Sequence, residues 1–211
     1  MNAKPRLGHL LVITDTLVQS RFSHEQLATL AYEGGADMIQ LRDKRLARDE
    51  YVQVAHRVRA RCDEHGVLFM VNDRVVVAHE VRADGVHIGR DDMSIADARA
   101  ILGEDAIIGA TAGSLDAARE AEEEGADYVG FGHIFPTPSK TKATPPVGLD
   151  ALAEACSKLK TPVIAVGGIT AENVRDVMGA GAWGVAVIAA VCAADDPRAA
   201  TARLRAAMEQ G

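Results

Sequence analysis

The sequence is poor in aromatic residues, which make up only 4% of its 211 positions. Its Lys and Arg residues form no basic block, and its formal net charge is -7. Proteins that bind nucleic acid combine basic patches with aromatic side chains that stack on bases. We therefore expect no nucleic acid among the partners of this protein.

Cysteine is also scarce. Cys62, Cys156 and Cys192 are odd in number and lie far apart, so they offer neither a disulfide framework nor the paired ligands of a zinc site. No apolar run is long enough to span a membrane, and the apolar stretch that follows residues 1–6 is too short for a signal-peptide core. We expect a soluble protein of the reducing cytoplasm that does not associate with membranes.

The chain is rich in short apolar runs that alternate with amphipathic stretches. Hydrophobic residues make up 48% of it, enough for a full core and, most simply, for one globular domain over residues 1–211. The apolar runs predict strands at 10–14, 38–41, 68–71, 85–87, 107–111, 128–131, 163–166 and 184–188. The amphipathic stretches predict helices at 24–33, 49–65, 94–102, 115–124, 149–158, 171–180 and 197–209, with a single helical turn near 75–79.

Strand-then-helix units repeated in this way predict an α/β fold, a single (β/α)8 TIM barrel. The strands are continuous apolar runs, as expected for parallel strands covered by helices. Gly-Ala-x triplets at 35–37, 125–127 and 181–183 stop a helix and start the next strand. The rival fold is a doubly wound open sheet, but no Gly-x-Gly-x-x-Gly motif follows the first strand. In a barrel the active site lies at the carboxyl ends of the strands.

Two of the predicted strands end in turns suited to holding a phosphate. The strand at 128–131 runs into a loop of glycine, proline, hydroxyl residues and Lys140. Backbone N–H groups, hydroxyl donors and an ammonium all suit phosphate oxygens. The strand at 163–166 is followed by Gly167 and Gly168, which let the backbone approach a ligand closely before a helix opens. Two such turns at successive strand ends indicate an enzyme.

Polar residues follow the other strands, and a barrel would bring them to one face. They are the runs Gln40-Leu41-Arg42-Asp43-Lys44, Asn72-Asp73-Arg74 and Gly89-Arg90-Asp91-Asp92, together with Thr111 and with Ile188 and Ala189. Carboxylates on two adjacent strands suit Mg2+, which binds one or two carboxylates together with water and phosphate oxygens. The set fits a magnesium-bound diphosphate beside a second, phosphorylated substrate. Taken singly, the charged run also fits a solvated cluster, and the two aspartates also fit helix caps.

The same residues resemble those of a known family. The resemblance rests on Gln40-Leu41-Arg42-Asp43-Lys44, Val71-Asn72-Asp73, Val86-His87-Ile88-Gly89 with Asp92, Gly125-Ala126-Asp127-Tyr128-Val129-Gly130, Phe135-Pro136-Thr137-Pro138-Ser139-Lys140 and Ile164-Ala165-Val166-Gly167-Gly168-Ile169. In this order, and over nearly the whole chain, the segments resemble the family of thiamine phosphate synthase and its relative thiazole tautomerase. The resemblance implies coupling of a hydroxymethylpyrimidine diphosphate to a thiazole phosphate, with release of pyrophosphate, in thiamine biosynthesis.

The resemblance also implies roles for single residues. Asp73 and Asp92 look like Mg2+ ligands, and Gln40 looks like a contact to the pyrimidine. Contacts to the diphosphate would come from Arg42, Lys44, Asn72 and Lys140. The cradle for the thiazole phosphate would come from Thr137, Ser139, Gly167, Gly168, Ile188 and Ala189. The family is thought to pass through a pyrimidine carbocation that the thiazole nitrogen captures, so Mg2+ and cations would stabilise the leaving diphosphate and no protein nucleophile would be needed.

Three positions depart from the synthase pattern. Thr111, a candidate substrate contact, stands where the synthase usually has serine, and Ala189 replaces a serine near the thiazole phosphate. His133 stands where proline is common, whereas the tautomerase resembles Phe-Gly-His here and uses the histidine as acid and base. The retained metal and diphosphate residues favour the synthase, while His133 and Ala189 favour a thiazole tautomerase. A non-catalytic regulator that binds a phosphate ligand on the same barrel is a third reading.

Overall fold

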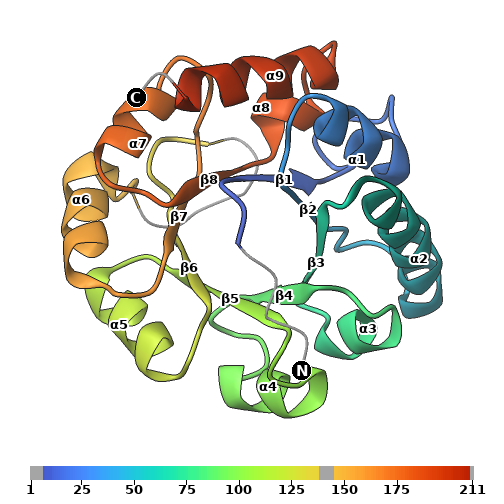
Figure 1. Ribbon diagram of the computed structural model, residues 1–211, viewed down its shortest axis with the longest axis horizontal. Helices are drawn as coiled ribbons and strands as arrows, with labels where there is room; N and C mark the ends of the chain where they lie inside the picture. Colours follow the sequence, from blue (N-terminus) through green and yellow to red (C-terminus); the bar gives the residue numbers. More distant parts are fainter. Residues whose placement is uncertain (1–6, 138–144, 210–211) are drawn as a thin grey trace.

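A computed structural model describes residues 7–137 and 145–209, in which eight parallel strands close into a barrel (Figure 1). Each strand pairs with the next in chain order, and β8 closes the ring on β1 with Ala186 opposite Leu11. The strands are β1 (Leu10–Thr14), β2 (Met38–Leu41), β3 (Leu68–Asn72), β4 (Gly85–Ile88), β5 (Ile107–Ala112), β6 (Tyr128–Gly132), β7 (Val163–Val166) and β8 (Gly184–Val187). The predicted (β/α)8 barrel is confirmed.

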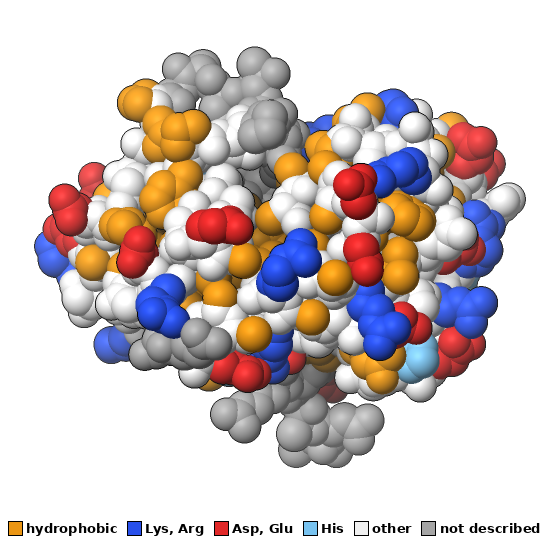
Figure 2. Space-filling view, turned by 90° about the horizontal axis from the view of Figure 1, so that it is seen from above, with side chains coloured by type: hydrophobic (Ala, Val, Ile, Leu, Met, Phe, Trp, Pro, Cys, Tyr) orange, Lys and Arg blue, Asp and Glu red, His pale blue; other side chains and the backbone are white. Residues whose placement is uncertain are grey.

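Helices surround the barrel on the outside (Figure 1). Within the described ranges they are α1 (His24–Glu33), α2 (Arg48–His65), α3 (Val75–Glu80), α4 (Ile95–Leu102), α5 (Leu115–Glu123), α6 (Gly148–Lys158), α7 (Val174–Gly179), α8 (Ala189–Cys192) and α9 (Pro197–Met208). None of these helices is both long and apolar enough to cross a membrane. On the face shown in Figure 2, basic and acidic side chains are interspersed.

The helix starts follow from local capping chemistry. Ser23 accepts a hydrogen bond from the backbone N–H of Gln26, whose side chain in turn accepts from the backbone N–H of Ser23. Ser94 caps α4 and Ser114 caps α5 in the same way, each through its side-chain oxygen. These caps satisfy backbone donors that the first turn of a helix leaves without partners. Ser94 is therefore the cap of α4 and not its first helical residue, one position from the predicted start.

Two predicted elements near the carboxyl end need correction. The helix predicted at 171–180 is shorter, because its first three residues form turns and α7 begins at Val174. The strand predicted at 184–188 ends at Val187, and Ile188 precedes the short helix α8, which the sequence reasoning did not predict. A helix of four residues contains a single turn, so it carries almost no amphipathic period by which it could be recognised.

The core consists of two layers, because alternate residues of each strand point to opposite sides. Outward-facing strand residues such as Val12, Ile39 and Phe69 pack under the helices in a large apolar cluster. Inward-facing residues fill the lumen with a second cluster: Leu11, Ile13, Met38, Met70, Ile107, Tyr128, Ile164, Ala186 and Ile188. On β2 and β3, the inward side chain two positions further along the strand is polar. Met38 is followed in this way by Gln40, and Met70 by Asn72. The lumen is thus apolar at its floor and polar at the ends of β2 and β3, whereas Ile13, Val166 and Ile188 keep it apolar near the ends of β1, β7 and β8.

Candidate active site

A cavity of about 380 Å³ opens at the carboxyl ends of the strands. Its floor is the apolar lumen, including Leu11, Tyr128 and Ile164. The following residues predicted from the sequence to bind substrate or to act in catalysis line it: Gln40, Asn72, Thr111, His133, Thr137, Gly167, Gly168, Ile188 and Ala189. Ser139 and Lys140 lie outside the described residues. The remaining predicted site residues, Arg42, Lys44, Asp73 and Asp92, are not among those lining the cavity.

Gln40 is the polar residue of the cavity with the clearest need of a ligand. It is 1% exposed, and in the described part of the chain neither its amide nitrogen nor its amide oxygen has a hydrogen-bond partner. A buried polar group without a partner is unfavourable, so such groups in native proteins usually mark a place that something else fills. A primary amide offers a donor and an acceptor side by side. Gln40 can therefore recognise a flat polar ring that carries the complementary pair.

The loops after β6 and β7 form one wall of the cavity and pack against each other. The backbone N–H of Ile134 donates to the carbonyl of Val166 at 3.0 Å, so the two segments stay paired beyond the end of β6. Gly167 has a φ of +99°, and a Cβ there would lie 2.3 Å from the Cβ of His133. A Cβ at Gly168, where φ is +68°, would lie 2.5 Å from the carbonyl oxygen of Pro136. The two glycines are therefore required for the close approach of the loops.

The turn after β7 is also held by a side chain from the residue before α7. Asn173 donates from Nδ2 to the carbonyl of Gly168 at 3.0 Å and accepts from the backbone N–H of Thr170 at 2.9 Å. His133, on the opposite loop, is 7% exposed, and its backbone carbonyl accepts from the N–H of Val147 at 2.9 Å. These bonds fix the wall on which His133 and the glycine turn meet.

Two carboxylates face each other beside the cavity. Asp73 directly follows β3 with a φ of +63°, and the Oδ2 atom of Asp92 accepts from the backbone N–H of Gly89 at 2.7 Å. Burial raises the pKa of Asp73, and the nearby Asp92 carboxylate raises it further, while Lys44 lowers it. The Nζ atom of Lys44 lies 3.4 Å from Oδ2 of Asp73. Paired carboxylates that repel each other in this way provide a place for a cation.

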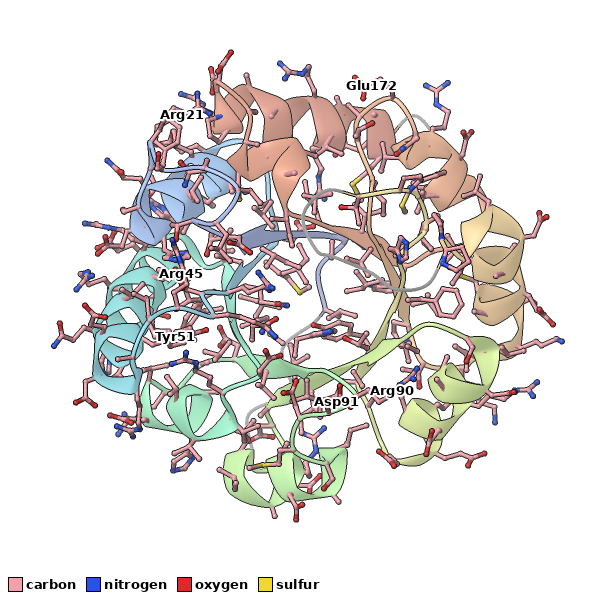
Figure 3. All side chains as sticks on the ribbon, turned by 180° about the vertical axis from the view of Figure 1, so that it is seen from behind. Arg21, Arg45, Tyr51, Arg90, Asp91 and Glu172 are labelled. Carbon is pink, nitrogen blue, oxygen red and sulfur yellow. The ribbon has the colours of Figure 1, made fainter. Side chains whose placement is uncertain are left out.

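The capping alternative for these aspartates does not hold for the helices that follow them. No side chain caps α3, which follows Asp73, and Ser94 caps α4, which follows Asp92. Figure 3 labels Arg90 and Asp91, which mark the turn that carries Asp92 at the rim of the barrel. Across residues 7–137 and 145–209, no group of three or more His, Cys, Asp and Glu side chains could hold a metal ion. The two carboxylates of Asp73 and Asp92 are the kind of oxygen ligand that suits Mg2+, whose remaining positions would be taken by water and phosphate oxygens.

Arg42 lies in a buried ion pair with Asp15, the residue that follows β1. Next to this pair, Asp43 accepts hydrogen bonds from Thr16, at 2.8 Å, and from Arg45, which Figure 3 labels at the loop after β2. Burial alone would raise the pKa of Asp43, but donors from the Arg45 main chain and side chain, Thr16 and His24 hold it well below its usual range. The network fixes the loop from which Lys44 extends.

The sequence reasoning missed three polar residues of this region. Asp15 immediately follows a predicted strand, so the rule used for the other strand ends could have found it. His87 and Tyr128 lie within strands and line the cavity, and they are joined by a hydrogen bond of 2.9 Å between Nδ1 and the hydroxyl. The other ring nitrogen of His87, Nε2, lies 2.8 Å from the hydroxyl oxygen of Thr111. No local signal separates these two residues from ordinary strand residues.

Comparisons with known proteins agree with this architecture. The family described as thiamine monophosphate synthase matches residues 10–191. A thiamine-phosphate synthase from Methanocella arvoryzae is 46% identical over 201 residues, which cover 95% of this chain and 95% of that protein. Another, from Salinibacter ruber, is 46% identical over 207 residues, which cover 98% of this chain and 91% of that protein. A solved thiamine phosphate pyrophosphorylase from Pyrococcus furiosus is 41% identical and covers 96% of each chain, with a TM-score of 0.88.

Proposed function

Because the chain belongs to the thiamine monophosphate synthase family, we propose that it is a thiamine-phosphate synthase, a transferase. It joins a hydroxymethylpyrimidine diphosphate to a thiazole phosphate and releases pyrophosphate. The observation that carries the proposal is the juxtaposition of the partnerless amide of Gln40 in the cavity with the Asp73 and Asp92 carboxylates beside it. The amide suits a polar heterocycle, and the two carboxylates suit a metal-bound diphosphate.

The pyrimidine binds over the apolar floor with its polar edge toward Gln40. The amide of Gln40 has a free donor and a free acceptor there, and an aminopyrimidine offers an amino donor next to a ring nitrogen acceptor. Leu11 and Ile164 supply apolar surface to the flat ring. In this arrangement the ring replaces the partners that the amide lacks, so binding removes an unfavourable buried group.

The diphosphate binds at the ends of β2, β3 and β4. Asp73 and Asp92 would hold Mg2+, which when bound draws charge from the leaving diphosphate. Lys44, already 3.4 Å from Asp73, adds a cation on the same side, and Asn72 lines the cavity between the pyrimidine and the metal. Arg42, held in its ion pair with Asp15, contributes a further positive charge to the diphosphate site. Lys140 completes this set in the proposal, although it lies outside the described residues.

The thiazole phosphate binds at the opposite wall. Gly167 and Gly168 expose backbone there, and Thr137 contributes a side chain from the facing loop. Ser139, which lies outside the described residues, is proposed to contact the same phosphate. Ile188 and Ala189 close the wall at the end of β8. Placing the two phosphates at opposite walls leaves the two rings next to each other over the floor.

The reaction then breaks the bond between the pyrimidine methylene carbon and the diphosphate oxygen and forms a bond from that carbon to the thiazole nitrogen. The protein supplies no nucleophile. Its side chains orient the two rings, which lowers the entropic barrier, and its cations stabilise the charge on the leaving group. The apolar floor limits the water that could capture the pyrimidine carbocation.

The proposed substrates are small molecules, and the reaction needs neither nucleic acid nor a membrane. We place it in the cytoplasm. The cysteines Cys62, Cys156 and Cys192 are all free thiols in the structure, which suits a reducing compartment.

A second candidate, thiazole tautomerase, is favoured by His133, which lines the cavity and could move a proton on a thiazole. One pair of assays separates the two. Coupling is followed as thiamine phosphate and pyrophosphate formed from both substrates with Mg2+, and isomerisation as the conversion of a thiazole carboxylate phosphate. We expect coupling by the native protein and by His133→Gln. Isomerisation without coupling in the native protein, lost about a hundredfold or more in His133→Gln, would replace the synthase by the tautomerase.

A further inference from the structure

Three side chains form a hydrogen-bonded chain that runs from the floor of the cavity to its polar rim. The hydroxyl of Tyr128 lies 2.9 Å from Nδ1 of His87, and Nε2 of His87 lies 2.8 Å from the hydroxyl oxygen of Thr111. The rings of His87 and Tyr128 stack with their centroids 5.5 Å apart. Tyr128 is fully buried, whereas Thr111 is partly exposed at the end of β5.

Two strand glycines make room for this chain. A Cβ at Gly109 would lie 2.0 Å from Cζ of Tyr128, and a Cβ at Gly130 would lie 2.7 Å from Cε1 of His87. Glycine weakens a strand, so its presence inside one usually marks a close approach. Here the tyrosine ring occupies the space beside one glycine, and the imidazole occupies the space beside the other. The two glycines therefore leave the space in the lumen that these two rings occupy.

The burial of Tyr128 determines the direction of the hydrogen bonds. Over the described ranges, the one partner of its hydroxyl is Nδ1 of His87. A buried O–H that donates to nothing is unfavourable, so the Tyr128 hydroxyl donates and Nδ1 accepts. In the neutral imidazole the other nitrogen then carries the hydrogen, so Nε2–H donates to Thr111.

We propose that Tyr128 and His87 are positioning residues that hold Thr111 as a hydrogen-bond donor toward the ligand. Since the Thr111 oxygen accepts from His87, its own hydrogen points away from the imidazole. Thr111 lines the main cavity and also a second hollow of about 250 Å³ that Asp92 lines. The acceptor is therefore an oxygen of the diphosphate that binds beside Asp92, an assignment that rests on the proposed function.

The direction matters because a diphosphate oxygen can only accept hydrogen bonds. A threonine hydroxyl on its own rotates freely and can either donate or accept. With one lone pair taken by His87, the hydroxyl is oriented before the substrate arrives, and a donor oriented in advance needs no rearrangement as charge develops on the leaving group. This also explains how a threonine at this position keeps the chemistry that a serine hydroxyl would provide.

The direct test is the tautomer of His87 in the full chain without ligand. In two-bond 1H–15N spectra of the 15N-labelled protein, the His87 signals are assigned as those that disappear in His87→Gln. We expect hydrogen on Nε2 and none on Nδ1. Hydrogen on Nδ1 alone, or on both nitrogens, would overturn the proposal. This readout needs no substrate, so it remains decisive even if the protein fails to make thiamine phosphate.

The second test measures pyrophosphate binding with Mg2+ by calorimetry. We expect Thr111→Val to weaken binding about tenfold, as for loss of a hydrogen bond to a charged group, and Thr111→Ser to restore most of it. Tyr128→Phe should weaken binding severalfold, and the double variant Tyr128→Phe with Thr111→Val should bind no worse than Thr111→Val alone. Effects that multiply in the double variant would mean that Tyr128 acts independently of Thr111 and would overturn the proposal.

The control for a general loss of stability is Tyr51→Phe. Tyr51 is 1% exposed, and its hydroxyl donates to the carbonyl of Leu41 at 2.6 Å, so the variant also loses a buried tyrosine hydrogen bond. We expect Tyr51→Phe to bind pyrophosphate like the native protein. If it weakens binding as much as Tyr128→Phe does, the effect of Tyr128 is structural and the positioning role is excluded.

Discussion

The carboxylate of Asp15 holds the guanidinium of Arg42 in a buried ion pair between the ends of β1 and β2. Only 1% of the Asp15 side chain and 8% of the Arg42 side chain are exposed. Asp15 also accepts from the backbone N–H of Leu17 at 2.8 Å, so one carboxylate joins the loop after β1 to the side chain of the residue that follows β2. The pair fixes where Arg42 can act in the proposed reaction.

Removing Asp15 should therefore destabilise the protein strongly. In Asp15→Ala the buried Arg42 charge loses its partner, and the free energy of unfolding should fall by about 3 to 5 kcal/mol in urea titrations. The matched control is Asp195→Ala, which breaks the exposed pair with Arg21 at 2.8 Å and should change stability by at most about 1 kcal/mol. Equal effects of the two variants would show that burial of the Asp15 pair is not what matters.

Gln40→Met should separate stability from function. The amide of Gln40 has no partner in the described structure, so replacing it by an apolar side chain of similar size should leave the free energy of unfolding equal or raise it by about 1 kcal/mol. The value of kcat/KM for the pyrimidine diphosphate should nevertheless fall by about a hundredfold or more, because the ring loses both of its hydrogen bonds. Met70→Leu, at the opposing position on β3, is the control and should change neither quantity much. Unchanged kcat/KM in Gln40→Met would remove Gln40 from the pyrimidine site.

Activity should depend on Mg2+ and on both carboxylates of the pair. We expect excess EDTA to abolish coupling and added Mg2+ to restore it, and Asp73→Asn or Asp92→Asn to lower kcat by orders of magnitude. In thermal unfolding, Mg2+ with pyrophosphate should raise the Tm of the native protein but not that of Asp92→Asn. Asp91→Asn changes the exposed neighbour and should behave like the native protein. Full activity in EDTA would contradict the proposed metal site.

Asp37 should make stability depend on pH at the other end of the barrel. Its carboxylate accepts from the backbone N–H groups of His9 and Leu10, both at 2.9 Å, and pairs with Arg205. Burial alone would raise the pKa of Asp37, but these donors lower it overall. A lowered folded-state pKa gives stability that is present above the unfolded-state pKa of about 3.9 and is lost as the pH falls through the folded-state value.

Asp37→Asn should therefore unfold more easily than the native protein at pH 7, by about 2 kcal/mol, and the gap should shrink as the pH falls below about 4. Urea titrations at several pH values measure it. The control is Glu33→Gln, whose exposed pair with Arg198 spans 3.7 Å and which should follow the native curve throughout. A gap of constant size down to pH 3 would show that the charge of Asp37 is not the cause.

The order of strands and helices could be predicted from the sequence because both periods are local. A buried parallel strand is a short apolar run, and a covering helix repeats its apolar residues every three or four positions. Most of the candidate site could be predicted for the same reason, because strand ends are also recognised from local sequence. Gln40, Asn72, Thr111 and Gly167 stand at or just beyond strand ends, and a closed barrel brings all strand ends to one face. The short helix α8 was missed because a single turn has no period.

Only the tertiary structure decided which of these side chains meet. Asp15 reaches Arg42 across 27 positions of the sequence, and Tyr128 reaches His87 across 41. Such contacts depend on the register of neighbouring strands and on which side chains share the lumen. Neither property can be predicted from a local segment of the sequence. Strand ends that carry polar groups could therefore be recognised in the sequence. Whether a charge there is neutralised by a neighbour, or an amide is left without a partner, was determined by packing.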